Sequence, residues 1–356
     1  MFNKIVLIFN VFIAFALILV HYSAQVNPLS FWPVAFLGLA YPIILIMNVL
    51  FLIYWIWGKD KKYILISLIA MLVSWDSNKV IFQLSSKAQT ANEISIMTWN
   101  VKNFDYYNWS GNENARSEMF ALIKEHRPEI LCLQEFYTED KGKFKNLKEL
   151  KKELNYEYQY FAKTYSIDNN RHWGLVMFSD YEIINTGKLV FTEGTRLNTC
   201  MYMDIELEGN QNTRIYNVHL QSNQFSSEDY KFLSALEDDE SNSSAKKIIQ
   251  KLKKGYINRA LQAKQVLESR LESPYPSIIC GDFNDTPISY AYQTISENMQ
   301  DAFVQKGVGF GKTFDNPSPF LRIDYALFHP FFSINDYESI SNELSDHYPI
   351  VVKFGY

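Results

Sequence analysis

The sequence predicts an α/β domain with a substantial β-sheet, preceded by two or three helices that cross a membrane. Two observations predict this organisation. Long apolar runs are confined to the first 75 residues, and from Ile94 onward short apolar segments typical of strands alternate with helical segments. A third observation concerns chemistry, because acidic, amide and histidine side chains recur at the ends of the strand-like segments.

The apolar runs occupy residues 5–20, 31–57 and 63–75. A bilayer core of about 30 Å requires about 20 helical residues, so the first two runs are predicted to cross, and the third needs flanking polar residues to complete a crossing. A removable signal peptide is the alternative for the first run. It is disfavoured because a second long apolar run follows directly and no small-x-small cleavage site stands out.

The lysines near these runs predict the topology. Lys4 precedes the first run, three lysines lie in residues 58–62, and residues 22–30 contain no lysine or arginine. Positive residues stay on the cytoplasmic side, so the N-terminus and residues 58–62 are expected inside. If residues 63–75 cross, as we favour, the remainder of the chain lies outside the cytoplasm, which is the periplasm in a Gram-negative cell. If they do not cross, it stays inside.

The expected domains are an anchor over residues 1–75, a polar linker over 76–93 and an α/β domain over 94–356. Residues 1–90 contain six lysines and two aspartates, whereas the rest contains 28 basic and 37 acidic residues, a net charge of −9. A domain that holds polyanions non-specifically is normally basic, and this one is not. Its three cysteines lie in apolar strand-like runs, which predicts buried free thiols rather than a disulfide framework or a zinc cluster.

Within the α/β domain, each expected strand is a short apolar run such as ISIMTWNV, and each expected helix is a longer, more polar segment such as the Lys- and Glu-rich one after residue 144. In chain order, the expected strands are residues 94–101, 129–135, 174–179, 200–207, 214–220, 277–283, 322–328 and 349–354. The expected helices are residues 113–126, 144–154, 245–272 and 289–297. The polar, acidic segment 226–245 is expected to end in a mobile loop.

Residues 280–285 read CGDFND, so a buried-looking strand ends in carboxylates and an amide. Gly, Asp and Asn are common turn residues, and one such strand end is explained by a turn. Six strand-like segments carry such residues at or near an end, however, and ligand sites in α/β proteins lie where strand ends converge. The residues concerned are Asn100, Gln134, Glu135, Asn217, His219, Asp282, Asn284, Asp324, Asp346 and His347.

The short motifs TWNVKNF, LQE, NVHL, GDFND, RIDY and SDHYP occur in the order seen in the endonuclease/exonuclease/phosphatase superfamily. That superfamily includes pancreatic-type deoxyribonucleases, exonuclease III-like repair enzymes, sphingomyelinases and inositol polyphosphate 5-phosphatases. The resemblance covers residues 94–356 and leaves the first 90 residues outside. It implies a four-layer α/β sandwich, in which two packed β-sheets are flanked by helices, with a divalent-metal phosphoesterase site at one rim.

The resemblance also implies the metal ligands. Glu135 of LQE is the expected principal ligand, with Asn100 of TWN beside it and Asp346 of SDH close to the ion. Carboxylate oxygens are hard ligands that suit Mg²⁺ or Mn²⁺, and a cation neutralises the phosphate charge that repels an incoming hydroxide. Lys102 stands where the repair enzymes usually have an aspartate, which weakens the resemblance to that branch.

The catalytic roles follow from the same motifs. Asp282 is expected to orient and deprotonate the attacking water, and Asn284 to contact the phosphate. Asp324 would pair with His347, since a carboxylate fixes the tautomer of a histidine and stabilises its imidazolium. His219 fits the deoxyribonuclease and sphingomyelinase branches, where it could protonate the leaving oxygen or bind a phosphate oxygen.

The sequence therefore indicates a membrane-anchored, Mg²⁺- or Mn²⁺-dependent phosphoester hydrolase. A nuclease-like phosphodiesterase acting on nucleic acid is favoured by the motifs. A phospholipid, sphingomyelin or inositol-phosphate phosphoesterase is the alternative, favoured by the anchor and the acidic domain. A non-catalytic scaffold would be expected to lack a ligand or the general base, and none is missing. The lipid bilayer is the expected macromolecular partner, and no protein partner can be inferred.

Four further residues were considered for roles near the site. Asp285 is interpreted as a turn residue, and Arg259 as a structural ion-pair partner. His172 and Trp173 are considered as substrate contacts.

Overall fold

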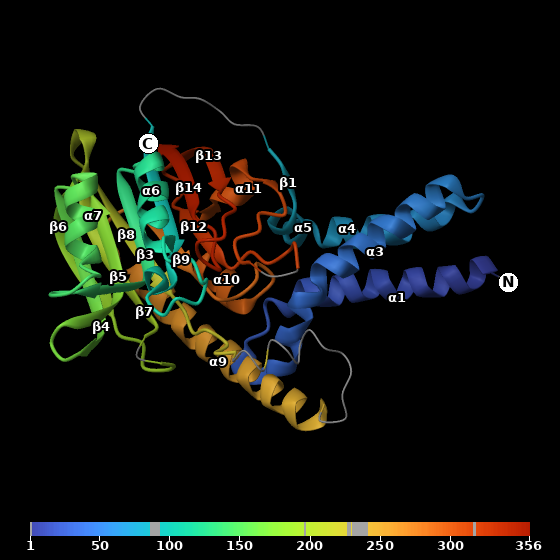
Figure 1. Ribbon diagram of the computed structural model, residues 1–356. Coiled ribbons are helices and arrows are strands. Elements are labelled where there is room, and N and C mark those ends of the chain that lie inside the picture. The colour runs from blue at the N-terminus through green and yellow to red at the C-terminus, as the bar shows by residue number, and fades with distance from the viewer. Residues whose placement is uncertain (1, 86–92, 196, 226–228, 230–240, 316–317) are drawn as a thin grey trace. The chain divides into compact units, whose positions relative to one another are not determined.

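The computed structural model describes residues 2–85, 93–195, 197–225, 229, 241–315 and 318–356. The chain forms two compact units (Figure 1). The first comprises Met1–Phe82, Asn223–Ala260 and Asp285–Thr294, and the second comprises Gln83–Ser222, Leu261–Asn284 and Ile295–Tyr356.

The second unit contains two six-stranded mixed sheets. In the first sheet the strand order is β13 (Ser333–Ser339), β14 (Ile350–Gly355), β2 (Ile94–Asn100), β3 (Ile130–Glu139), β5 (Arg171–Ser179) and β4 (Tyr158–Ile167). In the second sheet it is β10 (Gln300–Asp301), β12 (Asp324–Phe328), β9 (Ser277–Asp282), β8 (Gln211–His219), β7 (Thr199–Leu207) and β6 (Glu182–Leu189). A small separate sheet pairs β1 (Gln83–Leu84) with β11 (Val308–Gly309).

The core lies between the two large sheets. Side chains alternate between the faces of a strand, so every second residue of a central strand points inward. Ile96, Cys132 and Met177 of the first sheet share one buried cluster with Met203 and Cys280 of the second. The central strands are buried on both faces, which explains their nearly continuous apolar sequences.

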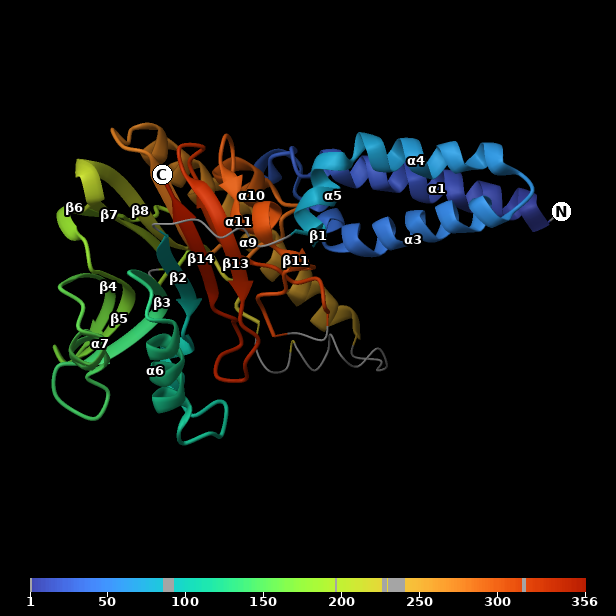
Figure 2. The ribbon, with the colours of Figure 1, turned by 90° about the horizontal axis from the view of Figure 1, so that it is seen from above.

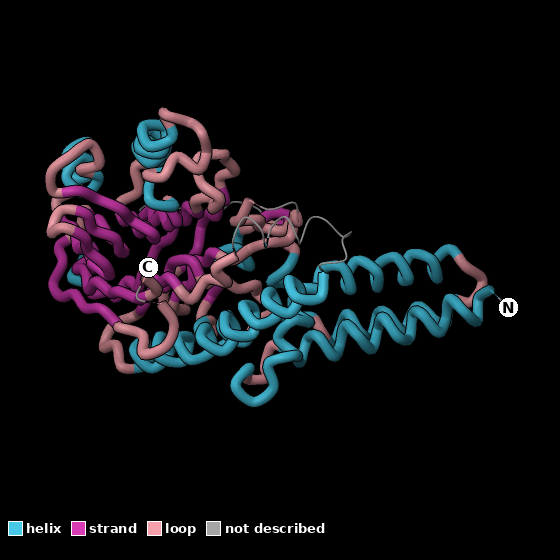
Figure 3. The backbone as a smooth tube through the Cα atoms, turned by 60° about the horizontal axis from the view of Figure 1, so that its bottom comes forward, coloured by secondary structure: helices cyan, strands magenta, loops and turns pink. Residues whose placement is uncertain are grey.

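Helices cover the outer faces of both sheets, giving four layers. On the first sheet, α6 (Ala115–His126) and α7 (Asn146–Leu154) contribute Met119 and Leu150 to a second buried cluster that also contains Trp99. On the second sheet, the hydroxyl of Tyr216 in β8 donates to the carbonyl of Ser269 in α9 (Ser241–Leu271) at 2.9 Å. Figure 3 shows the strands gathered between helical segments. The predicted four-layer α/β sandwich is confirmed.

The expected strands all occur, as β2, β3, β5, β7, β8, β9, β12 and β14, and the expected helices occur as α6, α7, α9 and α10 (Tyr290–Ile295). Strands β4, β6 and β13 and the short helix α11 (Ala302–Lys306) were not anticipated. The predicted mobile loop in the second half of 226–245 lies outside the described residues up to residue 240, and from Ser241 the chain is helical. All three cysteines are buried and free, as predicted.

The first unit contains the N-terminal helices. They are α1 (Phe2–Ser23), α2 (Pro28–Phe31), η1 (Trp32–Phe36), α3 (Leu37–Trp57), η2 (Lys61–Tyr63), α4 (Ile64–Val73) and α5 (Trp75–Ile81). Asn3–Ser23 and Pro28–Trp57 are long enough to cross a membrane, with mean hydropathies of 2.6 and 2.4. Both apolar runs that were expected to cross a membrane therefore form helices long and apolar enough to do so. The third apolar run forms a helix pair bent by 75° at Ser74, which together is long enough for one further span.

Helices α1, α3 and α4 pack as a bundle in which they run side by side (Figure 2). Asn10, the one polar residue that interrupts the first apolar run, is fully buried among them. Its amide donates to the hydroxyl of Ser67 at 2.6 Å and accepts from the indole of Trp55 at 2.9 Å. Asn10 of α1 therefore joins all three helices through interhelical hydrogen bonds.

The pair α4–α5 follows α1 along its length. At one end, the amide of Asn3 donates to Asp60, just before α4, at 3.0 Å. At the other end, Nδ1 of His21 lies 2.8 Å from the hydroxyl of Ser77 in α5. The bent pair thus runs from the N-terminal end of α1 to its C-terminal end.

Candidate active site

Asp282, the last residue of β9, is the centre of the site. In the second sheet its register partners are Asp324 on one side and His219 on the other. Adjacent strands thus deliver two carboxylates and an imidazole to the same rim. The Asp282 side chain is 1% exposed, so its charge is almost wholly removed from water.

Asn100 joins this rim to the first sheet. It is the last residue of β2, and its amide donates to Asp282 Oδ2 at 3.0 Å and to Glu135 Oε1 at 3.3 Å. One amide therefore holds carboxylates from both sheets. Because Asn100 and Asp282 are 182 residues apart, this contact exists only in the folded chain.

Glu135 is placed by a distortion of β3. The pairing of β3 with β5 shifts register between Leu133 and Phe136, and Glu135 has a left-handed φ of 47°. A bulge of this kind redirects one side chain out of the regular alternation. Glu135 is a third exposed, in contrast to Asp282. Burial, followed by the negative charge of Asp346, raises the pKa of Glu135.

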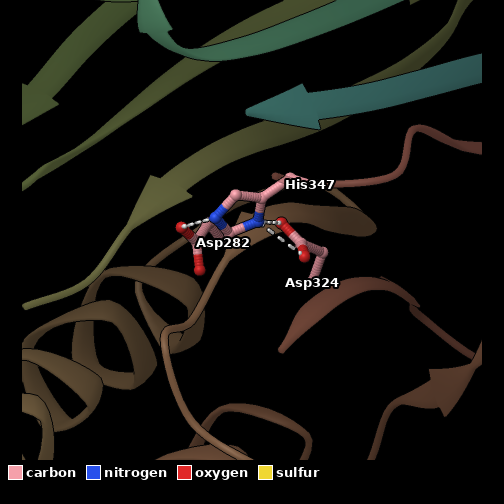
Figure 4. Close-up of side chains that lie close together, drawn as sticks. All are labelled: Asp282, Asp324 and His347. Atoms are coloured by element: carbon pink, nitrogen blue, oxygen red, sulfur yellow. Dashed lines mark hydrogen bonds and ion pairs between the residues drawn. The ribbon is translucent and has the colours of Figure 1, made fainter. Parts of the chain in front are cut away.

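His347 lies between two carboxylates (Figure 4). Its Nδ1 is 3.0 Å from both oxygens of Asp324, and its Nε2 is 3.6 Å from Asp282 Oδ2. Burial by itself lowers the pKa of His347, but the charges of Asp324 and Asp282 outweigh burial and raise the pKa to about 10. The imidazole is therefore a cation at neutral pH.

At Asp282, unlike at His347, the effect of burial on the pKa outweighs that of the neighbouring charges. Burial raises the pKa of Asp282 to about 6, although His347 lowers it. The carboxylate accepts the backbone N–H of Asn284 at 2.8 Å and its side-chain amide at 3.1 Å. Asn284 adopts a left-handed φ of 53°, which turns the chain back on the strand end and aims its amide at Asp282. Near neutral pH, Asp282 is ionised and can accept a proton.

His219 has a buried nitrogen without a partner. Its Nε2 lies 3.6 Å from Glu135 Oε1 and 3.7 Å from Asp282 Oδ2, and it makes no hydrogen bond to any part of the chain that the structure describes. Burial lowers the pKa of His219, so the ring is neutral near pH 7. An unpartnered nitrogen between two carboxylates is a suitable contact for a bound substrate.

Asp346 faces Lys102. The ammonium Nζ is 2.8 Å from Asp346 Oδ2, and it also lies 5.4 Å from the ring centre of Trp109. The four consecutive residues 102–105 all have left-handed backbone, with φ angles between 42° and 59°. Left-handed backbone costs roughly 1–2 kcal/mol for each such residue, so the surrounding fold must hold this turn in place.

The donor set fits a hard divalent cation. Glu135 and Asp346 supply carboxylate oxygens and Asn100 supplies an amide oxygen. The negative charge of Asp346 repels that of Glu135, and a bound cation would reduce this repulsion. Among the described residues, a different group of acidic and histidine side chains also has the spacing of metal ligands, namely Asp282, Asp324 and His347, whose ligand atoms lie within 4.8 Å of one another. The charges of Asp324 and Asp282 raise the pKa of His347 and so favour its protonated form at neutral pH, and an imidazolium cannot ligate a metal.

The structure also places the other residues noted in the sequence. Gln134 and Asn217 are fully buried and bind each other across the two sheets, with Gln134 Nε2 donating to Asn217 Oδ1 at 2.7 Å. They are therefore structural and lie outside the catalytic group. Asp285 is more than a turn residue, since it accepts from the Arg259 guanidinium at 2.9 Å in a buried ion pair. The sequence interpretation missed this because a turn signal carries no information about burial.

His172 is buried. Its ring nitrogens lie 2.8 Å from the Ser166 hydroxyl and 3.1 Å from Asp140 Oδ2.

Sequence reasoning missed an aromatic row beside the site. Tyr165, Trp173 and Tyr137 are register partners on β4, β5 and β3, with ring centres 5.6 and 4.8 Å apart. The row continues through Tyr106, Tyr107 and Trp109 at spacings of 4.2, 4.9 and 4.8 Å. The dense segment FDYYNW was the available signal in the sequence. Trp109 and Tyr107 are each 53% exposed, next to Lys102.

Sequence comparison identifies the class of protein. Residues 97–249 and 254–347 match the model of the endonuclease/exonuclease/phosphatase family, and residues 3–81 match a domain of unknown function, DUF8431. The chain belongs to the endonuclease/exonuclease/phosphatase family, whose members are phosphoester hydrolases that generally use divalent metals. No curated protein matches the chain by sequence.

Solved structures show the same fold at low identity. The catalytic domain of human nocturnin with bound sulfate is 17% identical, with a TM-score of 0.53, over 75% of this chain and 95% of that one. A family member from Bacteroides thetaiotaomicron is 16% identical, with a TM-score of 0.54, over 75% and 98%. A mannosyl-6-phosphatase of Bacteroides thetaiotaomicron is 16% identical, with a TM-score of 0.51, over 74% and 100%.

Proposed function

We propose that this protein is a membrane-tethered, divalent-metal-dependent phosphoester hydrolase, and most specifically a nuclease-like phosphodiesterase. The observation that carries the proposal is the arrangement around Asp282. The carboxylate of Asp282, the cationic imidazole of His347 and the neutral imidazole of His219 lie close together at the rim of the sheets. Phosphoester hydrolysis needs those three functions, namely activation of water, neutralisation of the phosphoryl charge and delivery of a proton.

Asp282 is the general base of the proposed reaction. Its pKa of about 6 leaves it ionised near neutrality yet basic enough to take a proton from water, which is the range in which a base works best. The amides of Asn100 and Asn284 both donate to Asp282 Oδ2 and hold it in one orientation. Since that orientation is set before substrate binds, little reorganisation is needed.

His347 supplies positive charge to the phosphoryl group. Asp324 accepts from Nδ1, which directs Nε2 toward the space beside Asp282. With a pKa of about 10, His347 donates a hydrogen bond over the whole physiological range. It therefore stabilises the charge that develops on the phosphoryl oxygens, and Asp324 is its positioning residue.

His219 is placed to serve the leaving group. A neutral imidazole with a free buried nitrogen can bind a phosphoryl oxygen or relay a proton to the departing oxygen. Asn284 is expected to contact the phosphate with its amide, which at present is shared between Asp282 and the carbonyl of Leu220 at 3.1 Å.

Glu135, Asn100 and Asp346 are proposed to hold Mg²⁺ or Mn²⁺. When bound, the ion would neutralise phosphate charge and lower the pKa of an attacking water. Asp346 also forms an ion pair with Lys102. The cation would also relieve the repulsion that raises the pKa of Glu135.

Nucleic acid is favoured as the substrate class by the rings beside the metal ligands. Exposed aromatic side chains stack on bases of single-stranded nucleic acid without sequence preference. Trp109 and Tyr107 present such rings, and Lys102 connects them to Asp346. A phospholipid or inositol-phosphate substrate is the second candidate, because exposed Trp and Tyr also suit a lipid interface.

The membrane topology is proposed from the first unit. Lys4 and the lysines of residues 58–62 favour a cytoplasmic position for that end of the bundle. The α4–α5 pair then reaches the other end of α1, at His21, which supports a third crossing. The hydrolase domain would therefore lie outside the cytoplasm, in the periplasm of a Gram-negative cell. The proposed domains remain an anchor over 1–75, a linker over 76–93 and the hydrolase over 94–356.

Two experiments test these proposals. The full chain in detergent is assayed with Mg²⁺, Mn²⁺ or EDTA against single- and double-stranded DNA, RNA, sphingomyelin and phosphorylated inositols. Metal-dependent cleavage of nucleic acid is expected, and activity confined to the lipid or inositol substrates would replace the nuclease assignment. An alkaline phosphatase fused at Tyr356 should be active, whereas a fluorescent protein at that position that folds in the cytoplasm would exclude the third crossing.

A further inference from the structure

A cavity on the outer side of the first sheet lies away from the catalytic residues. It has a volume of about 610 Å³, which is within the range of small-molecule sites. It is bounded by α7, by the C-terminal end of β3 and by the start of β4. Its lining includes Lys145, Lys148, Lys151, Lys152 and Gln159, together with the carboxylates of Glu139 and Asp140.

With four lysines against two carboxylates, the lining of the cavity has a net positive charge. Lys148 and Lys152 are one turn apart on α7, and residues spaced by three or four share a helix face. No ion pair joins any of the four to another residue within the described parts of the chain. This is notable in a domain whose net charge is −9, because acidic partners are plentiful.

Three of the nearby carboxylates make contacts with groups other than these lysines. Glu149 of α7 pairs with Arg116, and Asp140 Oδ2 lies 3.1 Å from the ring of His172. Glu139 accepts from the Tyr137 hydroxyl at 2.7 Å. Within the described residues none of these carboxylates forms an ion pair with the four lysines, and the lysines outnumber the carboxylates that line the cavity.

A polar acceptor adds a second feature. The side-chain oxygen of Gln159, which lines the cavity, is buried and makes no hydrogen bond to the described residues. A buried carbonyl oxygen without a donor costs free energy unless a ligand or water satisfies it. A hydroxyl group of a sugar is a suitable donor.

We propose that this cavity is an accessory binding site for a phosphate ester, in which the α7 lysines bind the phosphate and Gln159 accepts from a sugar hydroxyl. Several ammonium groups around one cavity select a multivalent anion over a single carboxylate. The site is separate from the catalytic group, because Glu139 follows Glu135 by four strand residues, or about 13 Å. The phosphate could belong to a free nucleotide or to a second phosphate group of an extended substrate.

Binding is measured by titration calorimetry on the full chain in detergent with EDTA, so no turnover is required. The probes are inorganic pyrophosphate and ADP. We expect K148Q/K152Q to weaken both by at least about tenfold, since two charge-assisted contacts are lost. The control K246Q/K247Q removes the same charge from exposed positions on α9 and should bind as the parent does. Q159L should weaken ADP and leave pyrophosphate unchanged.

The two sources of phosphate are then separated by kinetics. If the site holds a second phosphate of the substrate, K148Q/K152Q raises KM for an oligonucleotide and leaves KM for bis(p-nitrophenyl) phosphate unchanged. If it holds a free ligand, both KM values are unchanged while ADP binding is lost. Absence of pyrophosphate binding by the parent chain, or equal loss in both double variants, overturns the proposal. Because calorimetry measures binding without catalysis, its outcomes are independent of whether the protein is a nuclease, whereas the KM comparison rests on the proposed function.

Discussion

Replacing Asp324 by asparagine is the sharpest test of the proposed mechanism. The substitution keeps the shape of the side chain and an oxygen that can accept from Nδ1 of His347, but it removes the negative charge. Both carboxylate oxygens are 3.0 Å from that nitrogen, so the charge acts at hydrogen-bonding distance. The prediction is that D324N lowers the pKa of His347 and shortens the pH range over which the enzyme works.

The magnitude follows from the pKa of His347. Its value of about 10 is well above the usual 6.5, and Asp324 is the largest contribution that raises it. Because an opposite charge at this distance typically shifts a pKa by about 1–3 units, its removal in D324N should lower the pKa of His347 by roughly 2 units, equal to about 3 kcal/mol. The same linkage acts on stability. The favourable contribution of the His347 charge is fully present below pH 6.5 and is lost as the pH rises through 10.

The assay is the pH dependence of kcat/KM with bis(p-nitrophenyl) phosphate between pH 6 and 10.5 at fixed Mg²⁺. Activity should fall on the alkaline side as His347 loses its proton. A bound cation lowers the apparent pKa of this alkaline limb in the parent and in the variant alike. The test is therefore the difference between the two apparent pKa values. D324N should show the limb about 2 units lower.

D180N is the matched control, since Asp180 forms an ion pair with Arg127 outside the site. Its alkaline limb should coincide with that of the parent. If D324N also retains the parental limb, with activity reduced uniformly at every pH, Asp324 does not control the charge of His347 and the assigned pairing is wrong.

Four other outcomes are expected. E135Q keeps size and hydrogen bonding but loses a metal-binding charge, so activity should vanish at ordinary Mg²⁺ and return only weakly at very high Mg²⁺. Full activity at ordinary Mg²⁺ would remove Glu135 from the site. D324N/H347A should be little worse than the more damaging single variant, because residues that act as a unit are non-additive, and multiplicative losses would contradict the pairing. G281A should fail to fold, since a Cβ there would lie 2.0 Å from the Val218 carbonyl oxygen, whereas G209A, with open space around it, should remain soluble. N10L should lower the thermal midpoint of the chain in detergent by removing the hydrogen bonds to Ser67 and Trp55, and an unchanged midpoint would show that they contribute nothing.

The central strands were predictable and the edge strands were not. Strands such as β2, β3 and β9 are buried on both faces, so their sequences are continuous apolar runs. Strands β4, β6 and β13 lie at sheet edges and expose part of their surface. Their polar and apolar residues are mixed, as edge strands require, and this removes the signal that marks a core strand.

The site was predictable as a set of residues but not as a geometry. Asp282, Asp324, His219 and His347 stand in short motifs whose order is visible in the sequence, and the structure brings them together. The role of Lys102 was not predictable. In the sequence it is only a departure from the repair enzymes, and its contact with Asp346 joins residues 244 positions apart through a left-handed turn.

By itself, the sequence determined the two long apolar helices, the alternation of strands and helices and the identity of the residues that could carry the chemistry. These properties are local, since hydropathy and strand burial are recorded in neighbouring residues. Only the tertiary structure decided that Asn100 links two carboxylates, that α4 and α5 follow α1 to its far end, and that unpaired lysines line a cavity. Those arrangements depend on contacts between segments that are distant in the sequence, and no single stretch of the chain determines the free energy of such contacts.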